Sequence, residues 1–189
     1  HTYCTPQQYD LAHEWIRLNA DPATSAVIRR WARSHQVFEG AECPADIVKL
    51  IDQGKPDVRD RHLAALIELF HAGQQVAGRI VLQAMLPKLS AYAFRSSVTS
   101  RVDDRRDERL QLVLCEFWEV LTSYPTERRR ERVAANLALD TLHRLTEVSG
   151  SAEVPMDPDR INLLAPAVAD VVPGSEVSNE WSLDDLLDW

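Results

Sequence analysis

One short stretch of the chain collects side chains that can hold a single nucleic-acid strand. It contains an aromatic ring, a cluster of guanidinium groups and an amide, which belong to Tyr124, Arg128, Arg129, Arg130, Arg132 and Asn136. Guanidinium groups neutralise phosphates, and bases stack on aromatic rings, where each stacked base contributes about 1–3 kcal/mol. Alternatively, the arginines form a solvated helix face answered by Glu127 and Glu131. The residues alone leave both interpretations open.

A second group of side chains suits a protein partner. Apolar residues recur at i, i+3, i+4, i+7 and i+11, which predicts a helix whose buried face is Leu110, Val113, Leu114, Phe117 and Leu121. Helical spacing places four other side chains on a neighbouring surface, and these are Glu108, Gln111, Leu112 and Cys115. Charge pairs would set the register of a partner there, and apolar burial would supply affinity. The competing interpretation is a solvated face with local ion pairs between Glu108 and Arg105 or Arg109.

Enzyme motifs are absent from the sequence. There is no Gly-rich phosphate loop, no His-Glu-x-x-His and no Gly-x-Ser-x-Gly. Paired acids such as Asp103–Asp104 and Asp184–Asp185 fall in loop or tail contexts, where solvation explains them. We therefore expect no enzymatic activity and no cofactor.

The cysteines give no sign of a metal or a disulfide framework. Cys4, Cys43 and Cys115 are odd in number and lack close metal-binding spacing. We expect three reduced thiols. The usual burial of free cysteine favours a core position for Cys115, whereas its helical spacing favours the partner-facing surface.

Charge is unevenly distributed along the chain, whose formal net charge is −8. Residues 150–189 hold nine acids and one base, Arg160, which leaves 20 acids and 20 bases in residues 1–149. A duplex-binding domain usually shows a basic surplus. Any nucleic-acid contact is therefore expected to be a local patch of modest affinity.

No apolar run approaches the roughly 18 residues that a membrane span requires, and no segment resembles a signal peptide. This favours a cytoplasmic protein without membrane association. A chain of 189 residues with 45% apolar content can bury one good core, or one core with attached segments.

Helix-start signals recur near the amino terminus. In each of them a proline occupies the expected first helical position, at Pro6, Pro22 and Pro44. The first two helices are expected to run to about Leu18 and Ala32, and the third to end before Gly54. Farther along, two helical stripes are expected to be buried, one made of Leu63, Leu66, Ile67 and Phe70 and the other of Val81, Leu82, Met85, Leu89 and Tyr92. The pattern predicts an all-α helical bundle.

The break at Gly54-Lys55-Pro56 is a candidate boundary. It separates an amino-terminal helical extension, residues 1–55, from a central helical domain, residues 56–149. Within the extension, Trp15 and Trp31 are expected to be core anchors. Residues 96–107 are polar and are expected to be a loop that becomes a helix start.

An ordered pattern runs from Glu108 to Leu145. An acid precedes Gln111 by three residues, Trp118 follows it by seven, and a Tyr124-Pro125 turn leads to a helix with Asn136-Leu-Ala-Leu-Asp140. This pattern resembles conserved region 2 of bacterial RNA polymerase sigma factors, especially the extracytoplasmic-function type. Upstream, the segments 71–77 and 86–89 look like two further pieces of that region. Most basic residues are Arg rather than Lys, which favours a GC-rich, actinobacterial source.

The resemblance implies two binding surfaces. The helix with Glu108, Gln111, Leu112 and Cys115 would dock on the clamp helices of the polymerase's largest subunit. The segment from Tyr124 to Asp140 would hold the single-stranded non-template strand of promoter DNA at the minus-ten element. Family members can also have an anti-sigma protein as a partner.

This chain departs from the family in two respects. The family usually has a Phe and a Trp just before the Asn-containing helix, where this chain has Arg129 and its neighbours. It also lacks a recognisable helix-turn-helix domain. Two functions therefore remain: a sigma-like transcription factor that binds polymerase and promoter DNA, or a sigma-fold interaction protein or regulator that binds polymerase or another protein without promoter opening.

The acidic residues 150–189 are expected to be a linker and the start of a further helical segment. In residues 181–189, Leu183, Leu186 and Leu187 have helical spacing and Ser182 is a suitable cap. Such a short helix must pack against something. It is either the opening helix of a further helix-turn-helix domain beyond Trp189, which the resemblance favours, or a segment that folds back and masks residues 128–132.

Overall fold

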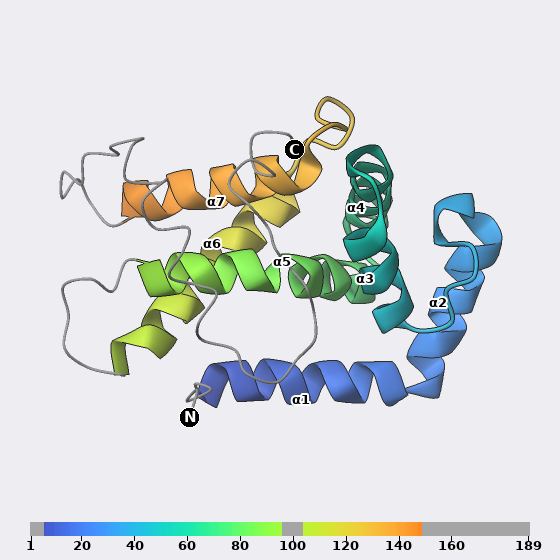
Figure 1. Cartoon of the computed structure of the whole chain (residues 1–189), viewed down its shortest axis with the longest axis horizontal. Coiled ribbons are helices and arrows are strands. Elements are labelled where there is room, and N and C mark those ends of the chain that lie inside the picture. Colours follow the sequence, from blue (N-terminus) through green and yellow to red (C-terminus); the bar gives the residue numbers. More distant parts are fainter. Residues whose placement is uncertain (1–5, 96–103, 149–189) are drawn as a thin grey trace.

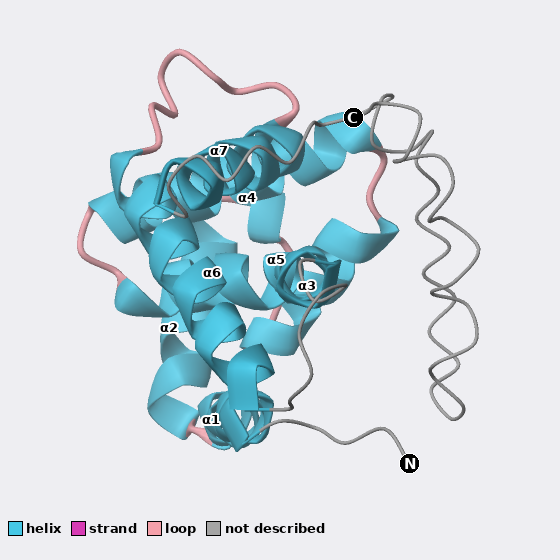
Figure 2. Ribbon diagram, turned by 90° about the vertical axis from the view of Figure 1, so that its left-hand side faces the viewer, coloured by secondary structure: helices cyan, strands magenta, loops and turns pink. Residues whose placement is uncertain are grey.

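Seven α-helices and one short 3-10 helix, η1, make up the described residues, which are 6–95 and 104–148 of the computed structural model. In chain order they are α1 (Pro6–Ala20), α2 (Pro22–Ser34), η1 (Gln36–Phe38), α3 (Pro44–Gln53), α4 (Pro56–His71), α5 (Gln75–Arg95), α6 (Asp104–Ser123) and α7 (Val133–Val148). No strand occurs in this part of the chain (Figure 2). The predicted all-α class is confirmed.

Most predicted helix starts are correct because their signals are local. Pro22 and Pro44 stand at the first positions of α2 and α3. Before α2, the Asp21 carboxylate accepts hydrogen bonds from the backbone N–H groups of Ala23 and Thr24, at 3.1 and 3.0 Å. The Thr24 hydroxyl and these two N–H groups lower the pKa of Asp21. Both α1 and α2 end two residues later than expected, at Ala20 and Ser34.

Helix α5 forms the centre of the bundle, with α1 below it and α7 above it in Figure 1. The two predicted stripes are buried, apart from the partly buried Tyr92. Trp31 is also buried, as expected, whereas Trp15 is only partly buried against the core. A single cluster unites residues from both sides of the predicted boundary, including Ile28, Ile47, Leu63, Ile80 and Phe117.

Gly54-Lys55-Pro56 is a turn between two helices that pack on each other, α3 and α4. Residues 6–53 and 56–95 therefore share one core, and the turn marks no gap in it. The expectation for residues 150–189 lies outside the described residues, as does most of the polar loop of residues 96–107. The helix start expected at the end of that loop is present at Asp104.

A buried arginine of α5 helps to attach helix α1. The Arg79 side chain is 9% exposed, and its Nε donates to Glu14 Oε2 at 3.1 Å. Its Nη2 donates to the carbonyl oxygen of Leu11 at 2.9 Å. The guanidinium carbon also lies 5.4 Å from the centre of the Trp15 ring. Residues 10–20 of α1 contain no fully buried side chain. The Arg79 contacts therefore act together with the partly buried Leu11 and Trp15, and with the hydrogen bond from the Ala45 N–H to Asn19 Oδ1 at 2.8 Å.

Gly78 allows a close approach between α4 and α5. A Cβ atom built on Gly78 would lie 2.6 Å from Cδ2 of Phe70. Phe70 cannot easily move, because its ring packs edge-on against Trp118 with centroids 5.3 Å apart. Small side chains at such crossings set the distance between helices.

We expect Gly78→Ala to destabilise the protein, although alanine is the better helix former. The propensity gain is about 1 kcal/mol, whereas forcing extra volume into a packed core costs about 1–3 kcal/mol. Urea unfolding would show a lower midpoint for the variant. As a control, Gly78→Ala combined with Phe70→Leu should recover part of the loss, and a more stable single variant would contradict the expectation.

Candidate functional site

The predicted buried stripe of α6 is confirmed. Leu110, Val113, Phe117 and Leu121 are buried and Leu114 is partly buried. On the adjoining surface, the four predicted side chains are all exposed, and these are Glu108, Gln111, Leu112 and Cys115. Leu112 is among the few large apolar side chains at the surface, at 36% exposure. Cys115 is exposed, so the expectation of a core position for its thiol is wrong.

Contacts from α4 and α7 hold α6 in place. His71 Nε2, at the end of α4, lies 2.9 Å from the carbonyl oxygen of Leu121 and donates to it. Glu116 of α6 is 8% exposed and accepts a hydrogen bond from Arg144 Nε of α7 at 2.8 Å. These bonds fix the rotation of α6, and therefore which of its side chains face solvent.

Tyr124, predicted to stack on a base, is buried in the turn after α6. Its side chain is 3% exposed, and its hydroxyl donates to the carbonyl oxygen of Arg129 at 3.0 Å. The Arg129 guanidinium carbon lies 5.5 Å from the centre of the ring. Burial raises the pKa of the Tyr124 hydroxyl. A base can stack on this ring only if the turn rearranges.

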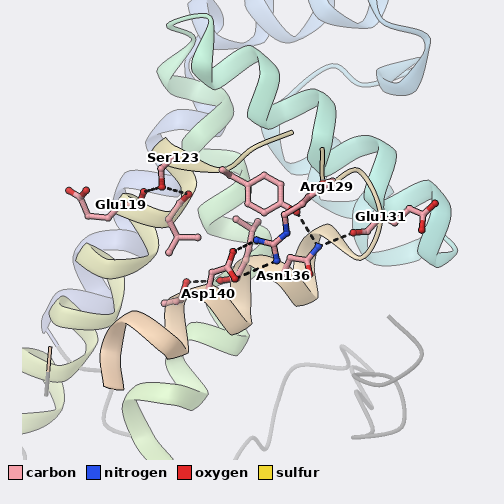
Figure 3. A network of polar contacts seen from close by, with 10 residues as sticks. Glu119, Ser123, Arg129, Glu131, Asn136 and Asp140 are labelled. Carbon is pink, nitrogen blue, oxygen red and sulfur yellow. Dashed lines mark hydrogen bonds and ion pairs between the residues drawn. The ribbon is translucent and has the colours of Figure 1, made fainter. Parts of the chain in front are cut away.

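Acids from two helices hold two of the predicted arginines. Arg129 Nη1 lies 2.5 Å from Asp140 Oδ2 of α7 (Figure 3). Arg130 Nη2 lies 2.9 Å from Glu68 Oε1 of α4. The alternative interpretation was a solvated face in which Glu127 and Glu131 balance the arginines. The acids in these two ion pairs are instead Asp140 and Glu68.

Asn136 has a structural role in the same turn. Its Nδ2 donates to the carbonyl oxygen of Glu131 at 2.9 Å and to the Tyr124 hydroxyl at 3.3 Å. Figure 3 shows its amide directed at these two groups. Both bonds stabilise the turn, so the amide donor is engaged within the protein.

A carboxylate that sequence reasoning missed organises the start of α7. Asp60 of α4 accepts from the backbone N–H of Arg132 at 2.6 Å and from that of Val133 at 2.7 Å. Arg132 has φ 54°, a left-handed conformation that is unfavourable for arginine. Asp60 thus caps the amino terminus of α7 from a distant helix. No local pattern could identify it, because it lies 72 residues before Arg132.

Arg128 is exposed and makes no ion pair with another described residue. The structure thus brings the predicted basic cluster together, with Arg129 paired to Asp140 and Arg130 paired to Glu68. Two of the four predicted arginines are therefore already engaged by carboxylates of the protein.

No group of His, Cys, Asp or Glu residues within 6–95 and 104–148 could hold a metal ion. In the same ranges, none of the helices has the length and apolarity needed to cross a membrane. The chain matches no protein-family model, no curated protein and no solved structure.

Proposed function

We propose that this chain is a helical interaction protein that binds another protein through the outer surface of α6. The observation that carries the proposal is the exposed face formed by Glu108, Gln111, Leu112 and Cys115 on a helix whose opposite side is buried. A carboxylate and an amide beside a leucine can combine charge pairing with apolar burial.

The proposed partner is the pair of clamp helices in the largest subunit of RNA polymerase. In the family that the sequence resembles, those helices present Arg and apolar side chains to the corresponding helix. Glu108 would pair with such an arginine, and Leu112 would be buried against the apolar side chains. The proposal places the chain in the cytoplasm with the polymerase and requires no catalytic group or cofactor.

A pull-down with purified polymerase tests the proposal. Replacing Gln111 by Ala and Leu112 by Asp should weaken binding at least about tenfold, because a buried charge at an interface centre costs more than 1.4 kcal/mol. Circular dichroism should stay unchanged, since both side chains are exposed. Leu139→Asp on α7 is the matched control, because Leu139 is 60% exposed and lies on another helix. Wild-type binding by the folded double variant would refute the proposal.

The second candidate is the sigma-like factor that binds promoter DNA and helps to open it. The exposed Arg128 beside Arg130 and Arg132 favours it, because these arginines lie in the segment that contacts the strand in the family. The ion pairs of Arg129 and Arg130 and the burial of Tyr124 weigh against strand capture by the turn in this conformation.

We expect any DNA binding to be weak and to prefer the single strand. Each phosphate contacted on a single strand contributes about −0.7 to the slope of log K against log salt concentration. With few free guanidinium groups the slope should be shallow, and Arg128→Ala should reduce it further. Fluorescence anisotropy at several salt concentrations measures both. A steep slope, or tighter binding to random duplex, would contradict this expectation, and an abortive-initiation assay with polymerase separates the two candidate functions.

A further inference from the structure

Helix α2 carries cations and no acid. Its exposed side chains include Arg29, Arg30 and Arg33, and its sequence from Pro22 to Ser34 contains no Asp or Glu. None of these three arginines makes an ion pair within the described part of the chain. In contrast, Arg79 and Arg129 are held by carboxylates.

The three guanidinium groups share one side of α2. Ala26, Arg29, Arg30 and Arg33 follow the i, i+3, i+4, i+7 spacing of a single helix face and are exposed. On the opposite face of α2, Ile28 and Trp31 are buried in the core. In Figure 1, α2 lies at the edge of the molecule, and the exposure of the three arginines shows that this face is open to solvent.

The sequence supplies an anionic segment of matching charge. Residues 176–189 contain no base, and their acids are Glu176, Glu180, Asp184, Asp185 and Asp188. The segment also carries apolar side chains that favour packing over full solvation, namely Trp181, Leu183, Leu186, Leu187 and Trp189. Electrostatic attraction favours binding of such an acidic segment to a cationic surface.

We propose that residues 176–189 dock on the cationic face of α2, defined by Arg29, Arg30 and Arg33. The length of the segment 149–175 permits this, because a random coil of that length would have a root-mean-square span of roughly 30 Å and would reach farther when extended. The tether also gives the segment an effective concentration of the order of millimolar, so weak contacts suffice.

Two arginine-rich surfaces could receive the acidic segment, the face of α2 and the turn after α6, and the ion pairs in the structure favour α2. At the turn, Arg129 and Arg130 already have carboxylate partners, and an incoming acid would have to displace Asp140 or Glu68. On α2 no such displacement is needed. The inference does not depend on the proposed function of α6.

Nuclear magnetic resonance on the full chain tests the docking from both sides. In the first arm, Asp184, Asp185 and Asp188 are changed together to Lys, and the amide shifts of residues 26–34 are compared with wild type at low salt. We expect shifts concentrated in α2, and we expect about 0.5 M salt to produce similar shifts in the wild type, since it reduces the Debye length to a few ångströms.

The second arm changes Arg29, Arg30 and Arg33 together to Glu and monitors the tail. The heteronuclear NOE of residues 176–189 should fall, and combining both sets of substitutions should restore part of it, because three acids and three arginines then exchange charge sign. Arg128→Glu is the control, because it reverses the charge of an exposed arginine outside α2. It should leave the heteronuclear NOE of residues 176–189 unchanged.

Two results would overturn the proposal. One is an α2 spectrum that is insensitive to the three tail substitutions. The other is a set of shifts concentrated on residues 128–133, which would locate the docking site at the turn. Failure of polymerase binding would bear only on α6, so the two proposals fail separately.

Discussion

Replacing Arg79 by alanine is expected to free α1 from the body of the protein and to lower the free energy of unfolding by about 2–4 kcal/mol. The variant loses the hydrogen bonds to Glu14 and to the Leu11 carbonyl, together with the contact over the Trp15 ring. It also leaves a space where the buried aliphatic stem had packed. Helix α1 has no fully buried side chain in residues 10–20 to compensate.

Urea unfolding and amide hydrogen exchange measure this effect. Exchange should accelerate first in α1, because local detachment precedes global unfolding. Arg61→Ala is the matched control, since Arg61 is 67% exposed and pairs with Asp57 on the surface of α4. That control should cost no more than about 0.5 kcal/mol. Equal losses in the two variants, or unchanged exchange in α1, would show that Arg79 does not attach this helix.

Replacing Asp60 by alanine is expected to lower the free energy of unfolding by about 2 kcal/mol. The carboxylate bonds two backbone N–H groups that no preceding helical turn can satisfy, and its negative charge lies at the positive end of α7. Its loss should fray the first turn of α7 and relax the left-handed conformation of Arg132.

The comparison that isolates this cap is Asp57→Ala, on the same helix. Asp57 is 70% exposed and forms an ion pair with the surface residue Arg61, so its removal should cost a few tenths of a kcal/mol. Thermal unfolding followed by circular dichroism ranks the two variants. If Asp57→Ala is as damaging as Asp60→Ala, the effect belongs to α4 itself and not to the cap on α7.

Features set by local sequence could be predicted well. The proline-marked starts of α2 and α3 and the buried stripe of α6 depend on residues within a few turns of one another. The exposure of Gln111 and Leu112 followed from the same periodicity. Helix ends were less accurate, and both α1 and α2 continue two residues beyond their expected ends.

Contacts between distant residues could not be predicted. Arg130 forms an ion pair with Glu68, which lies 62 residues earlier in the chain. The backbone N–H of Arg132 donates to Asp60, which lies 72 residues earlier. Tyr124 follows a helix and precedes a proline, which is typical of an exposed turn, yet the cap and ion pairs fold the turn over its ring. The sequence therefore predicted which residues gather at the turn but not which of their groups remain free.

The cap on α7 also constrains the order in which the chain folds. Because Asp60 lies on α4, the first turn of α7 gains its hydrogen-bond acceptor only after the segment containing α5 and α6 has closed into a loop, and loop closure costs entropy. Helices α6 and α7, which are near neighbours in the chain, can pair earlier. The amino-terminal end of α7 is thus a late-forming part of the fold, and damage to the cap should appear mainly as faster unfolding rather than slower folding.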